Sequence, residues 1–188
     1  MAKARTPREA WIDAGLRTLA AGGPDAVRIE ALARDLGVTK GGFYGFFADR
    51  PALLDALLDA WERRAVAEVL ERVEQEGGDP LTRARRAGAL TFSGELTPVD
   101  LAIRDWARRD PDVADRLRRV DGRRMDYLRA QFAGRFTDDL ELEARCLLAF
   151  SAAIATGLIA ADHPGHTRRE VLGRATALLF SDGRGGEA

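Results

Sequence analysis

One segment constrains the fold of this chain more than any other: residues 28–50, with the sequence RIEALARDLGVTKGGFYGFFADR. Ala33 and Gly37 lie four residues apart in it, a spacing that lets one helix end and a second pack across it with little side-chain bulk between them. Gly37 suits the left-handed conformation in which helices end, because it has no Cβ to clash. Apolar residues recur where two crossed helices would bury a shared core: Leu32, Leu36, Val38, Phe43 and Phe46. The pattern predicts a helix-turn-helix.

The second helix of this pair is predicted to begin at Lys40. Thr39 precedes it and is suited to cap it, because a threonine hydroxyl can accept a hydrogen bond from an otherwise unpaired backbone N–H. Lys40, Gly41, Gly42 and Tyr44 are expected to be exposed near its N-terminal end. In a helix-turn-helix this end meets base edges and phosphates in the major groove, so the pattern predicts binding to double-stranded DNA. The alternative is a helical hairpin with no role in DNA binding.

The bulk charge limits how such binding could work. The net charge is −1, so the molecule as a whole is no polycation, and residues 1–50 carry eight Lys or Arg against six Asp or Glu. This modest excess favours geometry-dependent binding by two copies over bulk electrostatic attraction. The single cysteine, Cys146, fits a reducing compartment. No segment has the apolar length of a membrane span or the core of a signal peptide, and we expect a soluble cytoplasmic protein.

Helix-start signals recur along the chain and predict an all-α fold. Asp79-Pro80, Thr97-Pro98 and Asp110-Pro111 place a capping residue before a proline, and Thr167 with Glu170 forms a capping box. No segment alternates with the period of a strand. About nine helices are predicted, at residues 7–21, 29–36, 40–46, 50–75, 80–93, 98–108, 111–134, 138–161 and 168–180. The unbroken helix 50–75 is expected to join a DNA-binding head, residues 1–49, rigidly to a C-terminal body, residues 50–188.

Residues 6–58 resemble the N-terminal domain of TetR-type (tetracycline-repressor-like) transcriptional regulators. The resemblance runs from AWIDAGLRTLAAGG through ALARDLGVTKGGFYGFF to DRPALLDAL. It implies a homodimer that binds a palindromic DNA operator, with a ligand pocket and a dimerisation surface in the body. The body sequence itself is less diagnostic of the family.

The resemblance also assigns DNA-contact residues. The recognition-helix positions that face the major groove are Lys40, Gly41 and Gly42. Tyr44 matches the family tyrosine that touches a backbone phosphate, and Thr39 matches the hydroxyl residue that caps the recognition helix. Arg50 stands where the family usually has lysine, and its guanidinium could serve the same phosphate contact. Arg28 stands where a Thr or Ser normally caps the preceding helix; the cap is therefore expected to be lost, while Arg28 could supply the contact. Gly45 replaces a larger side chain, so that contact is expected to be absent.

The middle helices are expected to enclose an effector pocket. The candidates to line it are Phe92, Arg104, Trp106, Tyr127 and Phe150. For each aromatic residue, ordinary core packing is at least as plausible, and for Arg104 a salt bridge with a nearby carboxylate is favoured over a ligand contact. The expected effector is a largely apolar small molecule. No metal or other cofactor is expected, because His163 and His166 lack an obvious third ligand.

Small residues along the predicted helix 138–161 would let another helix approach closely. Together with helix 168–180 it is expected to form a two-fold dimer interface. The alternative is that both helices only complete the monomer core.

The leading interpretation is a ligand-responsive repressor. One rival is a DNA-binding regulator whose body binds a protein partner. The other is a small α-helical enzyme, which the lack of hydrolase, metalloprotease and nucleotide-binding motifs disfavours.

Overall fold

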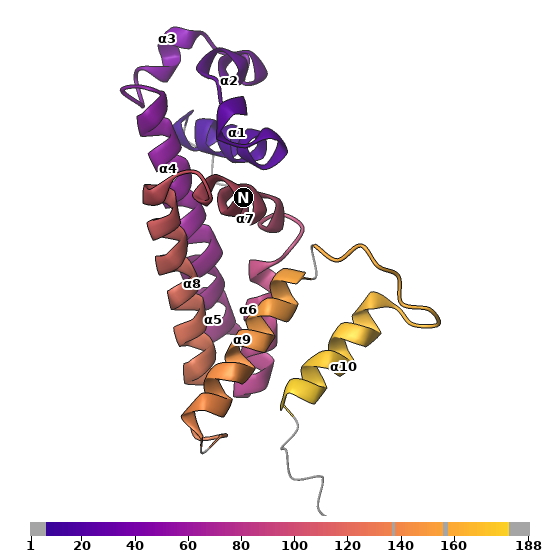
Figure 1. Ribbon diagram of the computed structural model, residues 1–188. Helices are drawn as coiled ribbons and strands as arrows, with labels where there is room; N and C mark the ends of the chain where they lie inside the picture. The colour runs from indigo at the N-terminus through magenta and orange to yellow at the C-terminus, as the bar shows by residue number, and fades with distance from the viewer. Residues whose placement is uncertain (1–6, 137, 156–157, 181–188) are drawn as a thin grey trace, which may run out of the picture.

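The computed structural model describes residues 7–136, 138–155 and 158–180, and this part of the chain contains helices and no strand (Figure 1). The predicted all-α fold is confirmed. The head comprises α1 (Pro7–Gly22), the short 3₁₀-helix η1 (Pro24–Ala26), α2 (Ile29–Asp35) and α3 (Lys40–Phe43). The body comprises α4 (Arg50–Glu62), the π-helical turn η2 (Arg63–Ala67), α5 (Glu68–Glu76), α6 (Pro80–Thr91), α7 (Thr97–Ala107), α8 (Pro111–Phe132), α9 (Asp139–Ala155) and α10 (Arg168–Phe180).

Most of the predicted helix starts are confirmed. The carboxylates of Asp79 and Asp110 accept hydrogen bonds from backbone N–H groups in the first turns of α6 and α8. At α10 the capping box is formed, because the Glu170 carboxylate accepts from the Thr167 backbone N–H at 2.7 Å and the Thr167 hydroxyl accepts from the Glu170 N–H at 3.2 Å. The prediction that Thr97 caps a helix is wrong: α7 already includes Thr97, and its buried hydroxyl has no partner among the described residues.

Two predicted helices are shorter than expected. The recognition helix was predicted to reach residue 46, but α3 ends at Phe43. Glycine is a poor helix former, and Gly41, Gly42 and Gly45 all fall in this segment. The helix predicted over 138–161 ends at Ala155; residues 156–157 lie outside the described part, and residues 158–161 are not helical.

The largest core joins the head to the upper body. Trp11 and Leu19 of α1, Leu32 of α2 and Phe43 of α3 are buried in the same cluster as Leu57 of α4. α7 packs against both α1 and α8, so it is the part of the body that lies between the head and α8 (Figure 1). A displacement of α7 or α4 therefore reaches the head through direct packing.

The predicted helix 50–75 is a continuous helical rod from Arg50 to Glu76, with one irregular turn that the sequence did not reveal. At η2 the backbone N–H of Glu68 donates to the carbonyl of Arg63, five residues earlier. Ala65 and Val66 in this wide turn are buried. In the described part of the chain, no helix is both long and apolar enough to cross a membrane.

Candidate nucleic-acid interface and ligand cavity

The turn between α2 and α3 has the predicted geometry. Gly37 adopts φ 67°, the left-handed conformation, and the backbone N–H of Val38 donates to the carbonyl of Ala33 at 2.9 Å. Phe43 is fully buried and contacts the Trp11 ring edge-on, with ring centroids 5.3 Å apart. These contacts fix the direction of α3 relative to α1 and α2.

Two residues predicted for this core lie outside it. Val38 is 47% exposed and Phe46 is 41% exposed, so both predictions are wrong. Because α3 ends at Phe43, the next aromatic residue to point inward is Phe47, which is buried and stacks on Phe43 with centroids 5.3 Å apart.

The N-terminal part of α3 presents an exposed, largely side-chain-free surface. Lys40, Gly41, Gly42 and Tyr44 are all exposed, as predicted, and Tyr44 retains 54% of its accessible surface. A Cβ added at Gly42 would meet no atom within 4 Å, and one at Gly41 would meet only the Thr39 hydroxyl, at 3.7 Å. The fold therefore does not require glycine at either position.

Neither α2 nor α3 has a side-chain hydrogen bond at its N-cap. Thr39 occupies the N-cap position of α3, but its side chain makes no capping hydrogen bond, so the predicted hydroxyl cap is wrong. Its hydroxyl is exposed with the rest of the side chain and so remains accessible from solvent. Arg28 occupies the N-cap of α2, also without a side-chain cap, as the missing Ser or Thr predicts. The Arg28 side chain is exposed on the same part of the head.

Lys40 is held by an acidic neighbour. Its ammonium group donates a hydrogen bond to the Glu30 carboxylate, which joins α3 to α2. This hydrogen bond raises the pKa of Lys40 and lowers the pKa of Glu30. Both side chains are exposed, so solvent weakens the pair and a phosphate could replace the carboxylate.

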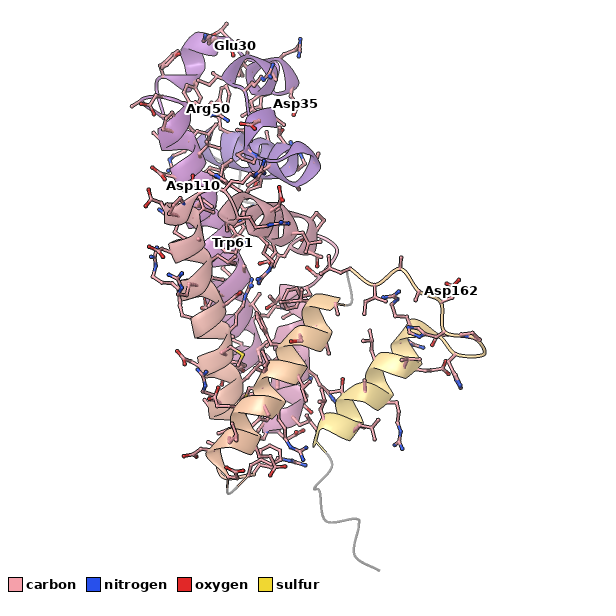
Figure 2. All side chains as sticks on the ribbon, in the orientation of Figure 1. Glu30, Asp35, Arg50, Trp61, Asp110 and Asp162 are labelled. Carbon is pink, nitrogen blue, oxygen red and sulfur yellow. The ribbon has the colours of Figure 1, made fainter. Side chains whose placement is uncertain are left out.

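Arg50 supports the loop before α2. Its Nε donates to the carbonyl of Val27 at 2.7 Å, and Nη2 donates to the carbonyl of Pro24 at 2.5 Å. Figure 2 places the residue next to the head, at the start of α4. Both bonds connect α4 to the segment that carries Arg28, so Arg50 positions a candidate DNA-contact residue.

The body contains a cavity of about 570 Å³ that is bordered by η2, α5, α6, α8, α9 and α10. Three of the predicted residues, Phe92, Tyr127 and Phe150, line it. The Phe92 and Phe150 rings lie 5.9 Å apart, and the Tyr127 hydroxyl donates to the Glu74 carboxylate at 2.8 Å. Burial, reinforced by this carboxylate, raises the pKa of Tyr127. Small side chains make up much of the remaining wall: Ala84, Ala87, Gly88, Ala149, Ala152, Ala153 and Gly173.

The other two predicted pocket residues do not line this cavity. The indole of Trp106 packs on the main core, and its Nε1 donates to Asp110 at 3.1 Å. Arg104 forms a two-pronged salt bridge with Asp121, at 2.8 and 2.7 Å, and a further one with Asp100 at 2.8 Å. Burial lowers the pKa of Arg104, but the two carboxylates outweigh it and the pKa is raised. The salt-bridge alternative for Arg104 agrees with these contacts.

Sequence reasoning missed Arg124, which lines the cavity and is only 6% exposed. Its terminal nitrogens donate to Asp100 at 2.9 Å and to Asp121 at 3.2 Å. Asp100 also accepts from Nε1 of Trp61 at 3.2 Å, so the cluster connects α8, α7 and α4. The three-residue spacing from Asp121 to Arg124 to Tyr127, which puts them on one helix face, is the signal that could have revealed it.

Comparison with known proteins agrees with this architecture. Residues 12–57 match the sequence model of the family described as bacterial regulatory proteins, tetR family. A search of curated protein sequences gave no match.

Three solved structures illustrate the structural similarity. A transcriptional regulator from Rhodococcus sp. Rha1 has a TM-score of 0.70 at 21% identity, covering 93% of this chain and 94% of the other. FadR from Bacillus subtilis, in complex with stearoyl-CoA, has a TM-score of 0.68 at 15% identity, covering 92% and 97%. AibR, in complex with isovaleryl coenzyme A and operator DNA, has a TM-score of 0.67 at 16% identity, covering 92% and 97%.

The fold is that of TetR-type transcriptional regulators. The resemblance seen in the sequence is therefore confirmed: residues 12–57 carry the tetR-family sequence pattern, and the remaining helices follow the architecture of such regulators.

Proposed function

We propose that the protein is a non-enzymatic transcriptional repressor of the cytoplasm that binds a palindromic operator as a homodimer and is released by a small-molecule inducer. The observation that carries the proposal is the exposed start of α3, held on a helix-turn-helix within the segment that matches the tetR family. Such a helix end fits the major groove and its flanking phosphates.

The glycines of α3 support close approach to DNA. Gly41 and Gly42 have open space where a Cβ would stand, so packing within the protein does not explain them. A DNA surface against this turn does, because it would leave little room for side chains there. Lys40 is positioned to leave Glu30 for a guanine edge or a phosphate, and Tyr44 and Arg28 are exposed beside it for phosphate contacts.

An exposed apolar stripe on α9 supports the homodimer. We call it the outer α9 face; it comprises Leu140, Ala144, Leu147, Leu148 and Ser151, all exposed. Leu140, Leu147 and Leu148 are 75%, 58% and 53% exposed, which is unusual for leucines spaced along one side of a helix. One recognition helix reads only a few base pairs, so two copies joined through this face would supply the two half-sites of a palindrome.

The cavity supports an effector with an apolar body. Its volume falls within the range of small-molecule pockets, and its wall is mainly aromatic, aliphatic and small side chains. Two regulators of the same fold, B. subtilis FadR and AibR, were solved with acyl-coenzyme A ligands. The cavity also touches Ala65 and Val66 of η2, in the rod that continues into α4 and the head.

The test is selection of DNA sites from a random pool, followed by binding measurements on the selected site. We expect a palindromic motif bound by a dimer. Lys40→Ala should alter the motif or weaken binding, whereas Arg118→Ala, an exposed residue of α8 far along the chain from the head, should change neither. Failure to enrich any motif, or full affinity for the selected site by a monomer in sedimentation, would contradict the proposal.

A further inference from the structure

One residue of the cavity wall carries a buried side-chain nitrogen that has no hydrogen-bond partner in the described part of the chain. Four buried side-chain polar atoms have no hydrogen-bond partner within the described ranges: Arg83 Nε, Thr97 Oγ1, Arg124 Nε and Gln131 Oε1. Of these four residues, Arg124 is the one that lines the cavity. A buried N–H without a partner is costly, so a ligand in the cavity is the natural acceptor for it.

Within the described ranges, no other polar residue of the cavity wall carries a buried side-chain atom without a partner. The Thr176 hydroxyl donates to the carbonyl of Leu172 at 2.7 Å, one turn earlier in α10. The Tyr127 hydroxyl donates to Glu74. Arg85 and Arg169 also border the cavity, but both are exposed to solvent. Thr91 also lines the cavity and is buried, but its hydroxyl is not among the unsatisfied atoms. Arg124 is thus the wall residue with a buried side-chain donor that no group within the described ranges satisfies.

The charge around Arg124 selects the kind of acceptor. Its guanidinium and that of Arg104 face the carboxylates of Asp100 and Asp121, so two positive charges balance two negative ones. A ligand carboxylate would add an unbalanced negative charge beside a buried, neutral cluster, at a large desolvation cost. A neutral carbonyl oxygen accepts the Nε–H without that cost.

We propose that the cavity binds a ligand with an apolar chain and a neutral carbonyl group, as in an ester, thioester, amide or ketone, and that Arg124 Nε donates to the carbonyl oxygen. The inference rests on the proposed effector function of the cavity and adds its chemical selectivity. The Phe92 ring, whose centroid lies 5.5 Å from the Arg124 guanidinium, lines the cavity beside it. Arg124 also donates a hydrogen bond to Asp100, and Asp100 accepts another from Trp61 of α4. The proposed carbonyl-binding residue is therefore connected to the helical rod that leads to the head.

The experiment compares three probes of similar length: methyl octanoate, octanoate and octane. Dissociation constants are measured in the absence of DNA, by calorimetry and by tryptophan fluorescence. Of the three tryptophans, Trp61 has its ring centre 5.9 Å from the Arg124 guanidinium. We expect methyl octanoate to bind about tenfold more tightly than octane, the effect of one hydrogen bond to a charged donor. Octanoate should bind more weakly than the ester.

Variants separate the hydrogen bond from general packing. Arg124→Lys keeps the positive charge opposite Asp100 but has no N–H at the Nε position, so the preference for the ester over octane should disappear while octane binding persists. Arg116→Lys is the matched control: it makes the same substitution in α8 at a residue that does not line the cavity and pairs with Glu62 at 2.8 Å, and the preference should remain. Tighter binding of octanoate than of the ester, an unchanged preference in Arg124→Lys, or no binding of any probe would overturn the inference.

A parallel DNA-binding titration distinguishes this inference from the proposed function. If the ester binds through Arg124 but operator affinity does not change, the selectivity stands and the inducer role fails. If the ester releases DNA equally well from wild type and Arg124→Lys, the inducer role stands and the role of Arg124 fails.

Discussion

Replacing Arg50 tests whether this residue supports the head or contacts DNA directly. Its two hydrogen bonds, to the carbonyls of Val27 and Pro24, would be lost in Arg50→Ala. Hydrogen bonds to charged groups contribute about 1.5–3 kcal/mol each. The side chain is partly exposed, which reduces the combined loss to about 1–2 kcal/mol. For a chain of this size we expect the midpoint of thermal unfolding to fall by about 3–6 °C.

The salt dependence of DNA binding separates the two roles. A lost phosphate contact lowers the slope of log K against log salt by about 0.9 per contact. If Arg50 acts by supporting the η1–α2 loop, Arg50→Ala should weaken DNA binding while the salt slope stays unchanged. Arg50→Lys should restore little of the lost affinity, because one ammonium group cannot span both carbonyls as the guanidinium does.

The assays are calorimetric unfolding and fluorescence anisotropy on operator DNA across a salt series. An unchanged unfolding midpoint in Arg50→Ala, together with a reduced salt slope that Arg50→Lys restores, would refute this reasoning and establish Arg50 as a phosphate contact.

Three further predictions concern the head and the dimer. Glu30→Gln should strengthen DNA binding a few-fold in anisotropy titrations, because Lys40 no longer has to leave a carboxylate, and the gain should vanish when Lys40→Ala is added. Phe43→Ala should destabilise the protein by about 3–5 kcal/mol in chemical unfolding, whereas the exposed Phe46→Ala should cost far less; equal effects would contradict the core assignment. Leu147→Asp on the outer α9 face should produce monomers in sedimentation and loss of operator binding with the helical content retained; a stable dimer would place the interface elsewhere.

The sequence predicted the head well because its signals are local. Gly37 and Phe43 act within a few residues of each other, so spacing alone indicates the turn and the buried ring. Val38 and Phe46 were wrongly predicted to be buried, because their burial depends on how far α3 extends. The length of α3 depends on two opposing effects, the low helix propensity of its glycines and the packing of its side chains.

The body was harder to predict because its cavity depends on how distant helices meet. Phe92 and Phe150 face each other across α6 and α9, a juxtaposition that spacing cannot show. Trp106 was assigned to the pocket as an aromatic residue of a middle helix, but the packing of α7 against the main core turns it elsewhere. Arg124 carries a charge, and a charged residue is usually expected at the surface. Its burial is explained by Asp100 and Asp121, whose carboxylates form salt bridges with it.

The wide turn η2 has a mechanical consequence. It lies where the rod meets the cavity, whereas Arg50 lies at the opposite end of α4 against the head. At 1.5 Å per residue, the helix between Arg50 and Ala65 is a lever about 22 Å long, so a tilt of about ten degrees at η2 would move its far end by about 4 Å. That is roughly a third of the ~12 Å width of a major groove. A π turn already departs from the regular hydrogen-bond ladder, so bending there breaks fewer regular α-helical hydrogen bonds than bending elsewhere in the rod. If the protein binds an operator as proposed, a small rearrangement of the body would thus be amplified into a misfit between α3 and the major groove.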